Sequence, residues 1–172
     1  MGVRIENLVT SGTFSLDGGT WDVNNNVWIV GDDDECVIID SPHDAAAIIG
    51  QVRGRKVLAI LLTHAHNDHI GAAREVAKAV EAPIYLNPED LVLWEQVYPD
   101  AGPDRHHADG DEFQVGGATL RAIHTPGHSP GSTCFYLEGE DTVFTGDTLF
   151  NGGHGDNTTI GAEQETLANI SQ

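Results

Sequence analysis

The stretch Thr63-His64-Ala65-His66-Asn67-Asp68-His69 follows a continuous apolar run, residues 57–62. Apolar runs of this length are typical of strands that are buried on both faces of a sheet. The histidine-rich stretch therefore begins where a buried strand ends. It places three histidines and one aspartate within six residues. Imidazole nitrogen and carboxylate oxygen are the ligands that zinc prefers when thiolate is absent, so the stretch predicts a metal site at the end of this strand.

The spacing of these side chains suggests more than one metal position. In an extended loop, His64 and His66 point the same way and can bind one ion. Asp68 and His69 lie at the turn into the next expected helix, residues 70–80, and can reach a neighbouring position.

Three later segments add ligands of the same kind. His128 lies in Thr125-Pro126-Gly127-His128-Ser129-Pro130-Gly131-Ser132, a turn that glycine and proline hold rigidly. Asp147 ends an apolar strand, and His154 stands among glycines. The candidate metal ligands are His64, His66, His69, His128, His154, Asp68 and Asp147. Five imidazoles and two carboxylates suffice for two metals that share one carboxylate and keep room for water, as in catalytic sites.

The remaining pattern indicates an α/β fold. Strands are expected near residues 3–10, 27–30, 36–40, 56–63 and 83–86, and again at 112–115, 118–124, 132–137 and 142–145. A helix is expected to begin with Ser41 as its N-cap, and another follows Asn87. Most helices fall in the first half, which fits two packed sheets with helices outside, a four-layer αββα sandwich. We expect one domain over residues 1–172.

Composition limits the partners. The chain has 27 acidic and 8 basic residues among 172, a formal charge of −19. This charge excludes nucleic-acid binding through a basic face and disfavours an anionic membrane surface. No run is long enough to span a bilayer, and the first residues do not form an export signal, so we expect a cytoplasmic enzyme acting on a small molecule. Cys36 and Cys134 are expected to be buried thiols.

The H-x-H-x-D-H, T-P-G-H-S-P-G-S and F-T-G-D motifs, in this order, resemble the metallo-β-lactamase superfamily, and within it the small glyoxalase II-like hydrolases. The resemblance implies an αββα fold with two zinc ions. His64, His66 and His128 would bind the first ion, and Asp68, His69 and His154 the second. Asp147 would bridge both ions together with a water or hydroxide. Because two cations lower the pKa of bound water, hydroxide is the expected nucleophile toward a thioester or related acyl substrate, with Asp68 and Asp147 as the catalytic candidates.

The chain departs from this family between Asp147 and His154, where only six residues intervene. Similar enzymes have a few dozen residues there, including a helix and the strand that carries the last histidine. We therefore expect one helix and one strand to be missing near the C-terminus, which weakens the second metal site. Residues 160–172 are expected to form one short helix, too little for a glutathione-binding domain.

Two other functions remain open from the sequence. One is a mononuclear iron persulfide dioxygenase of the same fold, with His64, His128 and Asp147 as a facial triad. The other is a catalytically poor metal-binding scaffold with an incomplete second site. Among the histidines outside the motifs, His124 is expected to be structural, and the surface is expected to carry His43, His106 and His107.

Overall fold

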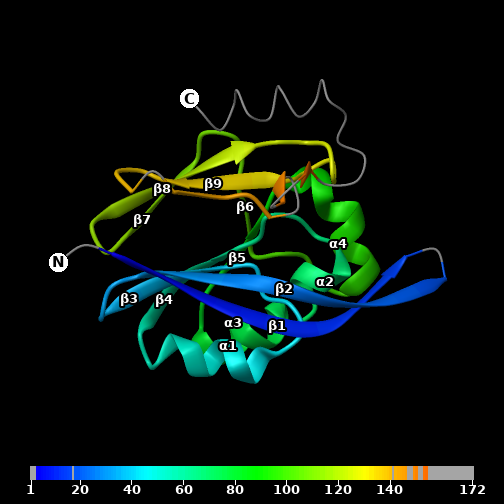
Figure 1. Ribbon diagram of the computed structural model, residues 1–172, viewed down its shortest axis with the longest axis horizontal. Helices are drawn as coiled ribbons and strands as arrows, with labels where there is room; N and C mark the ends of the chain where they lie inside the picture. The colour runs from blue at the N-terminus through cyan, green and yellow to red at the C-terminus, as the bar shows by residue number, and fades with distance from the viewer. Residues whose placement is uncertain (1–2, 17, 141, 147–148, 151–152, 155–172) are drawn as a thin grey trace.

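Two sheets lie face to face, and helices cover the outer face of the larger sheet (Figure 1). The computed structural model describes residues 3–16, 18–140, 142–146, 149–150 and 153–154. The sequence expectation of two packed sheets with helices outside is confirmed for the first sheet and for the packing of the two sheets. The helix expected over residues 160–172 lies outside the described residues.

The larger sheet has six strands in the order β1-β2-β3-β4-β5-β6. Its strands are β1 (Arg4–Leu16), β2 (Gly19–Gly31), β3 (Glu35–Ile39), β4 (Lys56–Leu61), β5 (Ile84–Leu86) and β6 (Arg105–His106). The first three run antiparallel, and β3 to β6 run parallel. Parallel neighbours need crossover connections, which here contain the helices. The histidine-rich loop begins at the carboxyl end of β4, at the same edge of the sheet as the carboxyl ends of its parallel neighbours β3 and β5.

The helices are short: α1 (Ala45–Val52), α2 (Asn67–Ile70), α3 (Ala73–Val80) and, after a 3₁₀ turn η1 (Pro88–Asp90), α4 (Leu91–Val97). The expectation of Ser41 as N-cap is wrong. His43 adopts a left-handed backbone (φ 53°), and the cap of α1 is Asp44, whose side chain accepts from the Ala47 N–H. The expected helix 70–80 is divided between α2 and α3. Asn87 caps η1 as expected, by accepting from the Glu89 N–H.

The smaller sheet is antiparallel, in the order β10-β9-β8-β7. Its strands are β7 (Glu112–Val115), β8 (Ala118–His124), β9 (Thr133–Leu137) and β10 (Thr142–Phe144). Gly116 and Gly117 both have positive φ in the two-residue turn between β7 and β8, which glycine adopts at little cost. A separate ribbon pairs β11 (Leu149–Phe150) with β12 (Gly153–His154). The four expected strands are therefore present with nearly the expected bounds.

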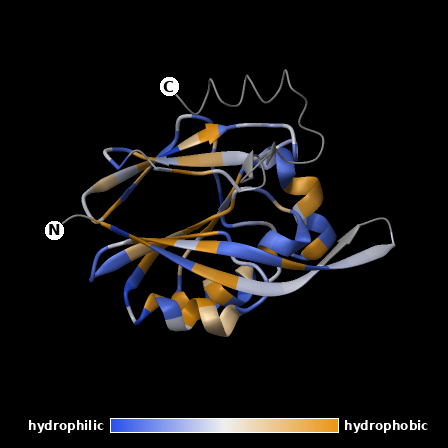
Figure 2. Cartoon of the chain, viewed as in Figure 1, coloured by the Kyte–Doolittle hydropathy of each residue, from blue (hydrophilic) through white to orange (hydrophobic). Residues whose placement is uncertain are grey.

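Two apolar cores hold the layers together. One lies between the larger sheet and the helices and includes Ile48 and Trp94, and the other lies between the two sheets and includes Phe135. Strand β3 alternates between them, since Ile38 belongs to the first core and Ile39 to the second. Figure 2 shows hydrophobic positions along these central strands and along the helices beneath them. A strand that is buried on both faces keeps its ends in fixed positions.

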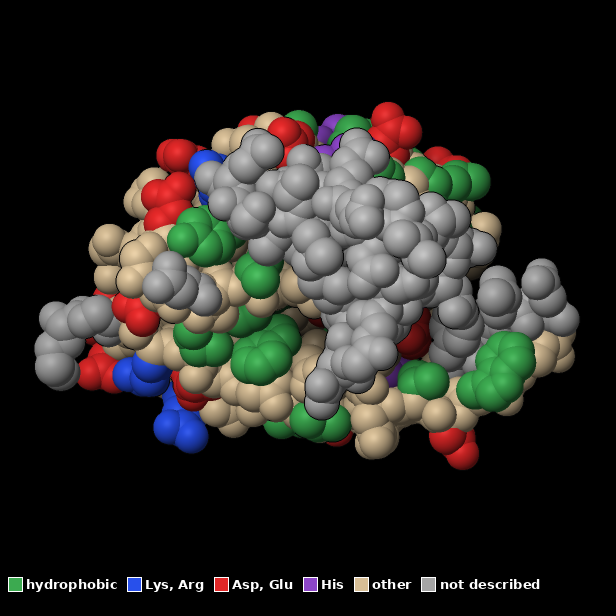
Figure 3. All heavy atoms as spheres, turned by 45° about the horizontal axis from the view of Figure 1, so that its top comes forward, with side chains coloured by type: hydrophobic (Ala, Val, Ile, Leu, Met, Phe, Trp, Pro, Cys, Tyr) green, Lys and Arg blue, Asp and Glu red, His purple; other side chains and the backbone are tan. Residues whose placement is uncertain are grey.

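The surface reflects the composition. Acidic side chains are spread around the face seen in Figure 3, in keeping with the formal charge of −19. Within the described residues, no helix is both long and apolar enough to cross a membrane. Cys36 and Cys134 are buried and are not joined by a disulfide, as expected.

The position of His107 differs from expectation. His106 is exposed, but His107 is completely buried beside Phe135, with ring centroids 5.3 Å apart. Its Nε2–H donates to the Leu62 carbonyl oxygen at 2.9 Å. Burial lowers the pKa of His107 below its usual 6.5, because the charged imidazolium loses its hydration. The neutral ring therefore fixes the strand end that leads into the histidine-rich loop.

We expect His107 to make the fold sensitive to acid. Its folded-state pKa is lowered, so its contribution to stability is complete above about pH 6.5 and is lost as the pH falls below that value. His107→Gln keeps an N–H donor for Leu62 but cannot titrate. Its free energy of unfolding, measured with urea, should fall less than that of the wild type between about pH 7 and pH 5. His106→Gln is the control, and identical pH slopes in all three proteins would contradict the prediction.

Candidate metal centre

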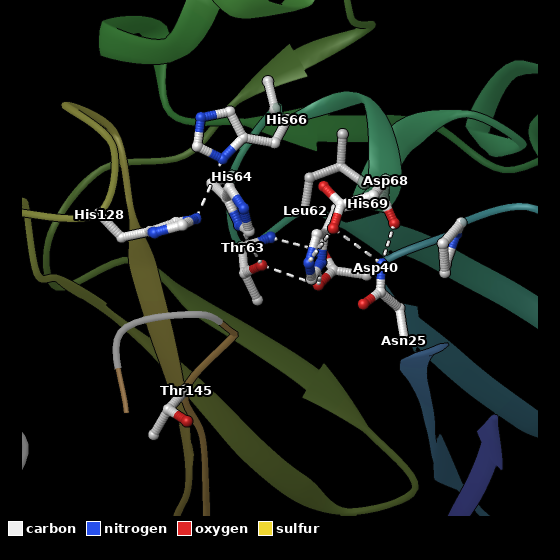
Figure 4. Close-up of polar contacts among 12 residues, drawn as sticks. Asn25, Asp40, Leu62, Thr63, His64, His66, Asp68, His69, His128 and Thr145 are labelled. Carbon is white, nitrogen blue, oxygen red and sulfur yellow. Dashed lines mark hydrogen bonds and ion pairs between the residues drawn. The ribbon is translucent and has the colours of Figure 1, made fainter. Parts of the chain in front are cut away.

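Three histidines from two separate loops meet at one edge of the sandwich. His64 and His66 lie in the loop after β4, and His128 lies in the turn between β8 and β9. Their ligand nitrogens all lie within 4.8 Å of one another. His66 Nδ1 is 3.0 Å from His128 Nε2, and Figure 4 shows these two side chains approaching each other beside His64. Three imidazoles at this separation have the composition of a metal-binding group.

A second group adjoins the first. His64, Asp68 and His69 also bring one ligand atom each within 4.8 Å of the others, and all three are buried. The short helix α2 supplies Asp68 and His69 from its first and last turn. His64 belongs to both groups, and one imidazole nitrogen binds one metal. If His64 serves the three-histidine group, Asp68 and His69 need a further ligand.

The expected further ligands come from the C-terminal part of the chain. Asp147 lies outside the described residues. The backbone of His154 is in β12, paired with Leu149, and its side chain lies outside the described part. The described segment before Asp147 ends at Gly146, where φ is +55° and a Cβ atom would lie 2.6 Å from Thr63 Oγ1. Glycine is needed there because a Cβ atom would approach the Thr63 side chain too closely, and the left-handed backbone adds a further cost for any other residue.

The sequence reasoning missed Asp40, which orients two of the histidines. This buried carboxylate follows β3 and accepts from the Thr63 N–H (2.8 Å) and the Thr63 hydroxyl (2.7 Å). His69 Nδ1 lies 2.9 Å from Asp40 Oδ2, so Nδ1–H donates there and Nε2 keeps its lone pair for a metal. Since the Thr63 hydroxyl donates to Asp40, it accepts from His64 Nδ1–H at 3.1 Å, which leaves His64 Nε2 for the metal side.

Asn25 on β2 holds the aspartate of the second group. Its side-chain amide donates to the Asp68 backbone oxygen and, at 3.1 Å, to Asp68 Oδ2. The same amide lies 3.3 Å from His43 Nε2, so His43, which was expected at the surface, is only partly exposed and contacts this site. Asp68 Oδ1 is buried and accepts no hydrogen bond from the described residues. A buried carboxylate oxygen of this kind fits a cation, because its desolvation is otherwise uncompensated.

The protonation state of His66 also fits metal binding. Burial lowers the pKa of His66, and the neighbouring His128 lowers it further. A neutral imidazole is the form that binds a metal ion, so less proton release is needed when His66 becomes a ligand. Imidazole nitrogens together with a buried carboxylate oxygen are a suitable donor set for zinc or ferrous iron.

The comparisons with known proteins agree with this architecture. The sequence matches the metallo-β-lactamase superfamily over residues 20–169. A probable metallo-hydrolase of Bacillus subtilis, YqgX, is 37% identical over 159 residues, which are 84% of this chain and 75% of that protein. An atrochrysone carboxyl ACP thioesterase of Aspergillus chevalieri is 35% identical over 153 residues; this match covers 84% of this chain and only 44% of the relative. The crystal structure of the BLEG-1 B3 metallo-β-lactamase has a TM-score of 0.71 at 28% identity, covering 96% of this chain and 84% of that one. Since the superfamily match extends over most of the sequence, this chain belongs to the metallo-β-lactamase superfamily.

Proposed function

We propose that the protein is a zinc-dependent hydrolase of thioester or related acyl substrates, similar to the glyoxalase II-like enzymes. The observation that carries the proposal is the convergence of His64, His66 and His128 within 4.8 Å, next to Asp68 and His69. Two relatives support the chemistry, since one is named a metallo-hydrolase and another an ACP thioesterase. This chain spans less than half of the thioesterase, so the acyl carrier of that protein is not transferred to it.

The residues have distinct roles in this proposal. His64, His66 and His128 would bind the first zinc ion, Asp68, His69 and His154 would bind the second, and Asp147 would contribute to both. Bound zinc would lower the pKa of a water ligand and polarise the scissile carbonyl. Asp68 Oδ1 can bind the second ion or accept a proton, because Asn25 holds Oδ2. A thiolate leaves readily, so thioester cleavage needs no strong acid to protonate the leaving group.

Metal content and turnover test this proposal together. The full chain is stripped with a chelator, reloaded with zinc, and assayed with an S-lactoyl thioester of a small thiol by following the released thiol. We expect two zinc ions per chain and hydrolysis that disappears on chelation and returns with zinc. One weakly held ion without turnover would contradict the proposal and favour the metal-binding scaffold.

The iron-dependent alternative requires a separate measurement. The protein is loaded with ferrous iron under anaerobic conditions and mixed with a low-molecular-weight persulfide and oxygen. Oxygen uptake by the iron form, with no thioester hydrolysis by the zinc form, would replace the proposed hydrolase with a dioxygenase. We expect no oxygen uptake above the rate of the metal-free protein.

A further inference from the structure

Asp90 is a fully buried carboxylate that ends the 3₁₀ turn η1. Its Oδ2 accepts from the Ala65 N–H at 3.0 Å and from the Ser129 hydroxyl at 2.8 Å. Its Oδ1 accepts from the Gly131 N–H at 2.6 Å. Three donors from two distant segments therefore converge on one side chain.

These donors belong to the two loops that carry the three-histidine group. Ala65 lies between His64 and His66, and Ser129 directly follows His128. The segments are 25 and 39 residues away from Asp90 in sequence, so no local turn explains their meeting. We propose that Asp90 is a positioning residue that fixes the His64–His66 loop to the His128 turn and so arranges the three-histidine site before a metal ion binds. The inference rests on the proposed metal site, and it adds to that site a device that holds it together.

The surroundings of Asp90 leave its carboxylate little freedom. The Asp90 N–H donates to the Asn87 carbonyl oxygen at 3.0 Å within η1. Gly131 packs directly against Asp90, since a Cβ atom there would lie 2.8 Å from Asp90 Cγ and 2.9 Å from both its Oδ1 and its backbone nitrogen. The turn is also held by His124, whose Nε2–H donates to the Pro130 carbonyl oxygen at 2.8 Å. His124 is thus structural, as expected from the sequence.

A carboxylate is required here because it can accept at both oxygens. In Asp90→Asn one oxygen becomes an NH₂ group, which must face either the Ala65 N–H or the Gly131 N–H. In either arrangement two N–H donors face each other in a buried contact. One of the two loops then loses its hydrogen bond to residue 90 and moves away from it. Changes in the groups that orient metal ligands typically weaken metal binding by about 10- to 100-fold.

The test uses Asp90→Asn, Ser129→Ala and Gly131→Ala in the full chain. Ser129→Ala removes one of the three hydrogen bonds and is expected to leave the fold intact. Gly131→Ala keeps Asp90 but places a methyl group against it. Gly102→Ala is the matched control, since a Cβ atom there would have nothing within 4 Å and its φ is not positive. Zinc affinity is measured by competition with a chromophoric chelator, and cobalt(II) absorption reports the geometry of the bound metal.

We expect Asp90→Asn and Gly131→Ala to lower the affinity for the more tightly bound zinc ion about tenfold or more. Ser129→Ala should lose less affinity, and Gly102→Ala should lose none. The cobalt(II) bands should change shape in the first two variants. In the metal-free wild type, the Ala65 and Gly131 amides should exchange slowly with solvent, and faster exchange in Asp90→Asn would show that the loops have separated.

Three outcomes would overturn the inference, and they differ in what they say of the proposed function. Unchanged zinc affinity and cobalt(II) bands in Asp90→Asn, with the wild type still binding zinc and hydrolysing thioesters, would overturn only the role of Asp90. A wild type that binds no zinc would overturn both. A variant that melts at a lower temperature but binds zinc as the wild type does would show that Asp90 supports only the fold.

Discussion

Replacing His64 with alanine is expected to abolish thioester hydrolysis, lowering kcat/KM by at least about a thousandfold. This corresponds to about 4 kcal/mol of lost transition-state stabilisation. The effect is large because His64 is the one histidine that belongs to both groups of converging ligand atoms. Its loss removes one ligand from the three-histidine group. Among the described residues, no other side chain belongs to both ligand groups and could replace it. Steady-state kinetics and metal content per chain measure the effect.

His106→Ala is the control for this variant. His106 is an exposed histidine on the two-residue strand β6, so its removal should change neither metal content nor hydrolysis. We also expect His154→Ala to lose less activity than His64→Ala, because the connection from Asp147 to His154 is only six residues long and gives the second site less support. Equal and complete losses in His64→Ala and His154→Ala would argue that both metal positions are equally formed and essential.

Replacing Asp40 with asparagine is expected to weaken zinc binding by about 10- to 100-fold and to lower hydrolysis by a similar factor. Asp40 accepts from the Thr63 N–H, the Thr63 hydroxyl and His69 Nδ1–H. The Thr63 hydroxyl in turn accepts from His64 Nδ1–H and so orients the His64 ring. An asparagine amide can accept at only one of its two positions, so either the Thr63 N–H or the pair of donors at Oδ2 faces another donor. The ring orientation of His69, and indirectly that of His64, then loses its constraint.

Asparagine is the informative replacement because the Asp40 backbone is left-handed, with φ 64°. Asparagine tolerates this conformation better than alanine, so the variant changes hydrogen bonding with little added backbone strain. Asp104→Asn is the matched control, since Asp104 is an exposed carboxylate that accepts from the Ile84 N–H away from the histidines. Zinc affinity by chelator competition and the urea unfolding curve separate lost metal binding from lost stability. An Asp40→Asn protein with wild-type zinc affinity would remove Asp40 from the metal site.

Local patterns in the sequence were sufficient for most of the fold. The apolar run 57–62 becomes β4 and the residue after it, and the strand-like segments of the second half become β7 to β10. These segments were recognisable because their side chains alternate between a core and the surface or are buried on both faces. The hairpin of β1 and β2 is much longer than expected. Residues 19–26 of β2 are exposed or partly buried, so hydrogen bonding along the ladder from Arg4↔Gly31 to Leu16↔Gly19, rather than burial, defines this part of the hairpin.

The candidate ligands were recognisable for a different reason. His64, His66, Asp68 and His69 stand close together in the chain, and His128 lies in a turn fixed by glycine and proline, so composition and spacing revealed them. Asp40 showed only a weak signal, a carboxylate at the end of an apolar strand. Asp90 resembled an ordinary residue in a helix cap. Their roles depend on partners between 23 and 41 residues away, and no local pattern encodes those contacts.

The sequence by itself determined the chemistry of this protein: which imidazoles and carboxylates are present, and that they follow buried strands. Only the tertiary structure decided how they are held. Packing of the two sheets brings the loop after β4 against the turn between β8 and β9, and the donors of these loops then need buried acceptors. Asp40 and Asp90 supply those acceptors. Because a buried donor without an acceptor is costly, the fold that forms is the one in which these carboxylates align the histidines.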